Sequence, residues 1–197
     1  MKKLMTSLCL AALSLTAAAQ YQLQNGSFEE WDNEGSTSIE PKHWNSFMTG
    51  EGNFKSLAAG QQVKKSNEVR PGTSGSSSVH IYARSVWGVV AQGNLTTGRI
   101  NMGSTNATDA NGNYNFTKTD NADFHQKITG CPDALRFWAK VSCFYGAAAS
   151  ATLHTEGYFQ DPAGNNITAQ VVAKANDSEI NSNDDWEEII IPFEYKL

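Results

Sequence analysis

Three short segments of this chain place aromatic and charged side chains at every second position, the spacing of residues that share one face of a β-strand. Aromatic rings offer flat apolar surfaces and charged groups offer directed hydrogen bonds, and sites for carbohydrates combine the two. If the three strands neighbour one another in one sheet, their polar faces would form a concave platform. The candidate ligand-binding residues are His80, Tyr82, Arg84 and Trp87 in the first segment, Arg136 and Trp138 in the second, and His154, Glu156 and Tyr158 in the third.

A plainer interpretation exists for each of these residues taken singly. Tryptophan side chains are mostly buried somewhere, so Trp87 and Trp138 could be covered core residues and the histidines ordinary solvent-facing strand residues. The grouping over three strands is what favours a binding site. Five other aromatic residues are assigned packing roles only, namely Phe28, Trp31, Trp44, Phe47 and Trp186.

Motifs for catalysis or metal binding are missing from the sequence. It has no His-Glu-x-x-His, no pair of Cys-x-x-Cys and no His-x-His, so zinc has no local signature. Asp109-Ala-Asn-Gly-Asn113 resembles a calcium loop, but its glycine comes one position early for an EF-hand, which favours a simple turn. We therefore predict no catalytic residue, metal or cofactor. A hydrolase needs two placed carboxylates, and the sequence cannot choose a pair among 20 acidic residues.

The first nineteen residues have the pattern of a signal peptide. Lys2 and Lys3 precede an apolar run, and Ala17-Ala-Ala19 is a small-residue cleavage site. Export to the periplasm, the outer cell surface or the medium is expected, with one domain over residues 20–197.

Loss of both lysines leaves 13 basic against 20 acidic residues, a net charge of −7. Such an acidic chain argues against nucleic acid as a partner, and no later stretch reaches transmembrane length. The oligomeric state stays open.

Periodicity of two dominates the remainder and predicts strands. Apolar residues alternate with polar ones over 79–84, 134–141 and 152–159, and the isoleucines of 188–193 suggest cover on both sides of that strand. A short helix over 147–151 is disfavoured by the strand pattern that follows. The polar stretch 101–123 is either a functional loop, anchored by Tyr114 and Phe116, or a hairpin around Asn111-Gly112.

Two cysteines, Cys131 and Cys143, would remain after cleavage. Twelve extended steps would separate them by roughly 40 Å, whereas bridged Cα atoms lie within about 7 Å. A disulfide between them is therefore not expected. Cys143 falls on the apolar face of the alternating pattern, which predicts a small core residue.

Several motifs, in order, carry a resemblance to a known family. They are Asn25-Gly-Ser-Phe-Glu-Glu-Trp31, Pro41-Lys-His-Trp44, Gly93-Asn-Leu-Thr-Thr-Gly98 and Leu135-Arg-Phe-Trp138. The chain resembles, over roughly Leu23 to Tyr195, the carbohydrate metabolism domain family of secreted gut-bacterial proteins. The resemblance implies an all-β, galactose-binding-like jelly roll, a β-sandwich of two antiparallel sheets. It also implies a role in glycan recognition, with an oligo- or polysaccharide as partner. Weak clustering of acids and the missing nucleophile motifs favour a non-catalytic binding module. A glycan-active hydrolase and a structural or adhesive surface protein are the alternatives.

Two features depart from the galactose-binding-like pattern. The chain stops directly after an apolar strand, so we expect the domain to continue beyond Leu197. In calcium-bearing jelly rolls the glutamate equivalent to Glu29 helps to hold the ion with an aspartate of the last strand, and that aspartate is absent here. A solvent-facing role for Glu29 is therefore favoured over a calcium site.

Overall fold

The computed structural model describes residues 21–58, 60–86, 88–142, 146–155, 159–160, 166–167 and 170–196. Within these ranges the protein is all-β, as the sequence predicts. Its helical content is one turn, α1 (Lys55–Ala58), and one 3₁₀ turn at Ala122–Phe124. No described helix has the length and apolar character needed to cross a membrane. The predicted signal peptide, Trp87, Cys143, Glu156 and Tyr158 lie outside the described residues.

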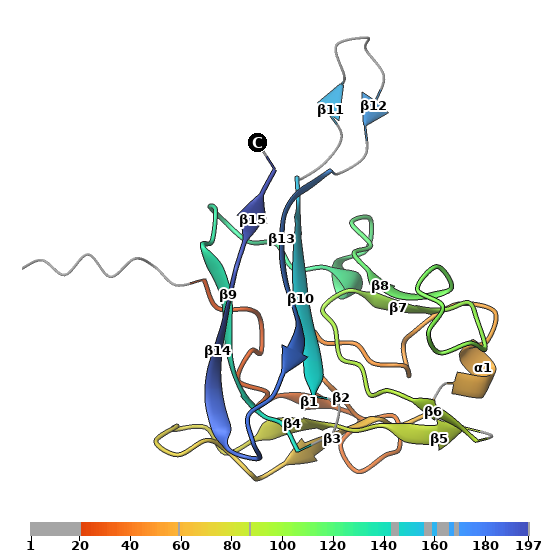
Figure 1. Ribbon diagram of the computed structural model, residues 1–197, viewed down its shortest axis with the longest axis vertical. Helices are drawn as coiled ribbons and strands as arrows, with labels where there is room; N and C mark the ends of the chain where they lie inside the picture. The colour runs from red at the N-terminus through yellow and green to blue at the C-terminus, as the bar shows by residue number, and fades with distance from the viewer. Residues whose placement is uncertain are drawn as a thin grey trace, which may run out of the picture.

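The strands are short and all their pairings are antiparallel. They are β1 (Trp31–Asp32), β2 (Glu40–Pro41), β3 (Val63–Ser66), β4 (Ser78–Ile81), β5 (Arg84–Val86), β6 (Val89–Ala91), β7 (Arg99–Met102), β8 (Asn113–Phe116), β9 (Ala134–Lys140), β10 (Ala147–His154), β11 (Phe159–Gln160), β12 (Asn166–Ile167), β13 (Val171–Ile180), β14 (Trp186–Pro192) and β15 (Glu194–Tyr195). The described strands form one three-stranded sheet, β10-β13-β15, and otherwise two-stranded pairs. Figure 1 shows β9, β14, β13 and β10 along the long axis and β3 to β6 across one end.

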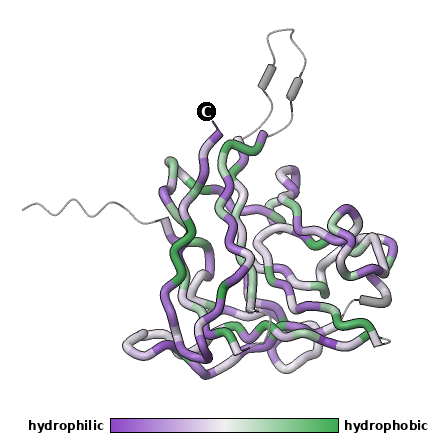
Figure 2. The backbone as a smooth tube through the Cα atoms, viewed as in Figure 1, coloured by the Kyte–Doolittle hydropathy of each residue, from purple (hydrophilic) through white to green (hydrophobic). Residues whose placement is uncertain are grey.

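The best-formed core lies between the β9–β14 pair and the β10–β13–β15 sheet. Leu135 and Phe137 of β9 and Ile189 of β14 pack against a buried cluster of Ala175, Ile180 and Ile191. Period-two spacing puts Leu135, Phe137, Ile189 and Ile191 on one face of the β9–β14 pair. Ile180 lies five positions after Ala175 and reaches the same cluster beyond a register shift in the β10–β13 pairing. Figure 2 shows the apolar stretch of β14 within this upright part of the chain. Two packed antiparallel layers are what the sequence predicts for a β-sandwich.

Two details of the predicted strand pattern are wrong. Ile190 is 49% exposed, so β14 is covered on one face only, the face of Ile191. The expected strand over 79–84 is divided into β4 and β5, and Ile81 at the end of β4 is 43% exposed. The division has a local cause, because Arg84 starts a new pairing with Ala91 of β6 while β4 stays paired with β3.

The polar stretch 101–123 contains a hairpin, the second of its two predicted alternatives. β7 and β8 pair from Arg99–Phe116 to Met102–Asn113. The Asp109 carboxylate accepts hydrogen bonds from the backbone N–H groups of Asn111 (3.0 Å) and Gly112 (3.1 Å), so the expected turn is present. The hydroxyl of Ser104, followed by these backbone donors, lowers the pKa of Asp109.

Cys131 is a free, exposed thiol. The strand that the sequence places after it is present as β9, so the extended spacing used against a Cys131–Cys143 bridge holds at least through Lys140. β14 pairs with β9 and β15 pairs with β13, so both strands at the end of the described chain have partners.

Candidate functional site

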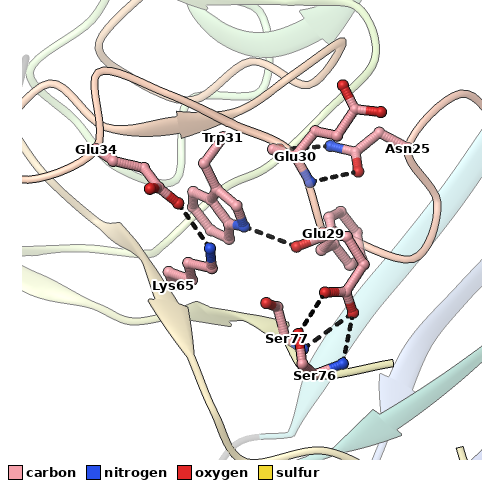
Figure 3. Close-up of polar contacts among 9 residues, drawn as sticks. Asn25, Glu29, Glu30, Trp31, Glu34, Lys65, Ser76 and Ser77 are labelled. Atoms are coloured by element: carbon pink, nitrogen blue, oxygen red, sulfur yellow. Dashed lines mark hydrogen bonds and ion pairs between the residues drawn. The ribbon is translucent and has the colours of Figure 1, made fainter. Parts of the chain in front are cut away.

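The opening motif serves the structure of the N-terminal segment. The Asn25 side chain donates to the carbonyls of Glu30 (2.8 Å) and Lys42 (3.0 Å) and accepts from the Glu30 N–H (3.1 Å). The indole of Trp31 donates to the Phe28 carbonyl at 2.7 Å (Figure 3). The Asn25 side chain therefore forms hydrogen bonds with the backbone of two chain segments and has a structural role.

Glu29 in the same motif is partly exposed and has several hydrogen-bond donors. Its carboxylate accepts hydrogen bonds from the Ser76 hydroxyl (2.7 Å), the Ser76 N–H (2.8 Å) and the Ser77 N–H (3.0 Å) (Figure 3). These donors, the Ser76 hydroxyl foremost, lower the pKa of Glu29 from 4.5 to about 2. Through these hydrogen bonds, Glu29 connects the N-terminal segment to the end of the loop that joins β3 to β4.

That β3–β4 loop, residues 67–77, brings two side chains to the outer face of β9. The Arg70 guanidinium lies 4.8 Å from the centre of the Trp138 ring. The Glu68 carboxylate lies 2.6 Å from Lys140 Nζ. The loop thus rests on β9 through one cation–π contact and one ion pair.

Around these contacts the strand register assembles one outer surface, which we call the Trp138 face. Arg136 stands opposite Ile190, Trp138 opposite Glu188, and Lys140 opposite Trp186. The Trp138 face consists of these six residues together with Glu68, Arg70 and Asp184. Trp138 is 42% exposed with Arg70 in place, and it projects from the face opposite the core. The interpretation of Trp138 as a covered core residue is therefore wrong.

Ion pairs hold the polar groups beside Trp138. Arg136 lies 3.5 Å from Glu188, and Lys140 lies 3.6 Å from Asp184 in addition to its bond with Glu68. The hydrogen bond that Lys140 donates to Glu68 is the chief reason that the pKa of Lys140 is raised, so its ammonium stays charged. The Trp138 face is thus an accessible indole within a set of paired charges.

A second surface, the Tyr82 face, holds the first predicted group of residues. Lys64 pairs with His80 across β3 and β4, and the Tyr82 N–H donates to the Gln62 carbonyl at 3.0 Å. The ammonium of Lys64 lies 5.6 Å from the centre of the Tyr82 ring, and the His80 ring meets that ring edge-on at 5.6 Å. The Tyr82 face consists of Gln62, Lys64, His80, Tyr82 and Arg84.

The two faces meet through the β3–β4 loop. Ser78, at the start of β4, donates its hydroxyl to the Glu68 carbonyl at 2.6 Å, and the Glu68 side chain bonds Lys140. Sequence reasoning missed Gln62, Lys64, Glu68 and Arg70. Lys64 and Gln62 are two positions apart and so share one face of a strand. Which residues of the neighbouring strand lie beside them could be known only from the strand register.

His154 does not join either face. It belongs to β10 and pairs with Val171 of β13, whereas the strands of Trp138 and His80 pair with β14 and β3. The three predicted strands therefore lie in three different sheets, and the single concave platform is not formed by these strands. A hollow of about 250 Å³ beside Gln24, His125 and Lys127 contains none of the predicted residues.

Among the described residues no group of three or more His, Cys, Asp or Glu side chains is arranged to hold a metal ion. No model of a known protein family matches the chain, and neither a curated protein nor a solved structure matches it. Fold and surface chemistry are therefore the basis for any functional assignment.

Proposed function

We propose that this protein is an exported, non-catalytic glycan-binding module of the galactose-binding-like jelly-roll type, acting in carbohydrate recognition or utilisation. The observation that carries the proposal is the exposed indole of Trp138, set among ion-paired side chains on the outer face of β9 and β14. The all-β layered fold is compatible with this role, and the argument for it rests on the site.

A sugar ring needs an apolar surface on one side and fixed polar partners at its edge. One side of a pyranose is a surface of C–H groups, which can lie on an indole plane, while its hydroxyls need fixed donors and acceptors. Around Trp138, the carboxylate of Glu188 and the guanidinium of Arg136 are restrained by their mutual ion pair. Groups that are already ordered lose less entropy when a ligand binds.

The test is a glycan array followed by titration of each hit with the parent and with two variants. Trp138→Ala should weaken binding by roughly 1–3 kcal/mol, the usual loss when a contact of this kind is truncated. Tyr114→Ala is the matched control, because Tyr114 is an aromatic of similar exposure on the β7–β8 hairpin. Melting temperatures of both variants separate lost contacts from lost stability.

Each outcome of this comparison has a definite meaning. Loss of affinity in Trp138→Ala alone supports the Trp138 face. Loss in Tyr114→Ala alone moves the site to the hairpin. The absence of any glycan ligand would favour the structural or adhesive alternative.

A glycan hydrolase is the second candidate, and one observation favours it. Glu68 and Asp184 both approach Lys140 Nζ, at 2.6 Å and 3.6 Å, so two carboxylates lie close together beside Trp138. Retaining glycosidases use two carboxyl groups about 5–5.5 Å apart. A reducing-sugar assay on the same preparation decides the matter. We expect no sugar release; release abolished by Glu68→Gln and Asp184→Asn would replace the binding proposal with a hydrolase.

A further inference from the structure

The cations of the Tyr82 face differ from the other positive charges of the described chain. Most of those others have acidic partners: Lys42 with Glu30, Lys65 with Glu34, Arg99 with Glu51, Lys118 with Asp120, Arg136 with Glu188, and Lys140 with Glu68 and Asp184. No described acid forms an ion pair with Lys64, His80 or Arg84. In a chain of net charge −5, Lys64 and Arg84 together with His80 form a basic group on one face.

Arg84 is the most unusual member of the group. It is half-buried, its Nε is shielded from solvent, and that atom has no hydrogen-bond partner. Its guanidinium lies against Gly60, where a Cβ atom would overlap the Nη1 and Cζ atoms. Partial burial of a guanidinium without a counter-charge is unfavourable, so an anion bound to the rest of this group would stabilise it.

Gln62 beside it is a second unpartnered polar group. Its side chain is completely buried and donates to the carbonyls of Ala91 (2.8 Å) and Gln92 (3.2 Å), next to the residue that pairs with Arg84. The amide oxygen of Gln62 accepts no hydrogen bond. The end of β3 beside Arg84 therefore contains two polar atoms that are shielded from solvent and have no hydrogen-bond partner, Gln62 Oε1 and Arg84 Nε.

We propose that the Tyr82 face is a subsite for the oxyanion of an acidic sugar, a uronate carboxylate or a sulfate ester, bound by Arg84 and Lys64. The inference rests on the proposed glycan-binding function and deepens it by naming the class of ligand. Arg84 supplies a planar set of donors that matches an oxyanion. Tyr82 acts as a positioning residue, since its ring holds the Lys64 ammonium on this face.

The experiment is a calorimetric titration of the intact domain with three trisaccharides of equal size, one carrying uronates, one carrying sulfates and one neutral. The parent should bind at least one acidic trisaccharide about tenfold or more tightly than the neutral one, because a hydrogen bond to a charged group contributes that much. Arg84→Gln and Lys64→Gln should each remove most of this preference while leaving the neutral sugar unaffected. Which acidic trisaccharide binds distinguishes carboxylate from sulfate.

Two further variants serve as controls for charge and for position. Lys65→Gln removes the same charge from the adjacent residue, which is paired with Glu34 on the other face of β3, and it should keep the preference. Gly60→Ala keeps every charge but displaces the guanidinium, and it should lower affinity for the acidic sugar only. The acidic sugar should raise the melting temperature of the parent and not that of Arg84→Gln.

The possible failures are distinguishable. Equal affinity of the parent for acidic and neutral sugars, or equal losses in Lys64→Gln and Lys65→Gln, overturns the acidic subsite and leaves the proposed function standing. If none of the three trisaccharides and no sugar on the array binds, the proposed function fails and the subsite fails with it.

Discussion

Single side chains in this protein join segments that are far apart in the sequence. The Glu29 carboxylate gathers three donors from Ser76 and Ser77, 47 and 48 positions away. Arg70 and Glu68, from the same loop, reach Trp138 and Lys140 of β9. A loop without regular structure is thereby held at both ends by side-chain contacts, and Glu29 holds one of those ends.

Replacement of Glu29 should show this role through its pH dependence. Because the pKa of Glu29 falls from 4.5 to about 2 on folding, its ionised form stabilises the folded state. The contribution is complete above about pH 5 and is lost as the pH falls towards 2. Glu29→Gln should therefore melt at a lower temperature than the parent at pH 7, and the gap should close between pH 5 and pH 2.

Glu30→Gln is the matched control for that measurement. Glu30 is the adjacent acid, exposed and paired with Lys42 at 3.2 Å, and exposed ion pairs contribute little to stability. Its melting curves should follow those of the parent at every pH. A gap between parent and Glu29→Gln that is the same at pH 7 and pH 2 would mean that the ionised carboxylate is not the stabilising group.

At the scale of elements, local pattern predicted the inner faces but not the pairings. The alternation of Leu135 and Phe137 was sufficient to identify the core face of β9, since a residue's parity is fixed by the pleat. The break between β4 and β5 was not predictable, because it arises from a new partner, β6, and not from the residues at 82–83. For the same reason, Lys64 could not be placed beside Tyr82 without the register of β3 and β4.

Neighbouring isoleucines of β14 test the assigned faces directly. Ile191 is 5% exposed in the core cluster, and Ile191→Ala should lower the free energy of unfolding by about 2–5 kcal/mol. Ile190 points to the outer face, and Ile190→Ala should change that free energy by about 0.5 kcal/mol or less. Chemical denaturation of the two variants gives both values, and equal losses would contradict the one-sided burial of this strand.

The molecule as a whole consists of small antiparallel strand pairs, and only one part of it forms two packed layers. The two sheets around Ile180 and Ile191 pack as a sandwich, while β3 to β8 form separate hairpins at one end and side of that sandwich (Figure 1). The candidate faces lie where these hairpins meet the sandwich, which no reading of one strand at a time could reveal. The composition and periodicity of the sequence predicted the class of fold; the location of the faces depends on long-range pairing.

The far-ultraviolet circular dichroism spectrum provides a check at this scale. The protein, after removal of the first nineteen residues, should give a spectrum of β-type with only a trace of helix, because the described helices comprise four and three residues. A substantial helical signal would be incompatible with the architecture described above.

The way the β3–β4 loop is fixed has a practical consequence for protein engineering. Its tip, from Pro71 to Ser74, lies between the Arg70 contact with Trp138 and the Ser76 bonds with Glu29. Gly72 at the tip has open space around its backbone. A dye or a short epitope could be introduced at Ser74, which is exposed and lies four positions after Arg70. Occupation of the indole by a ligand would shift Arg70 and with it the dye, so this loop tip is a natural place to build an optical sensor into the domain.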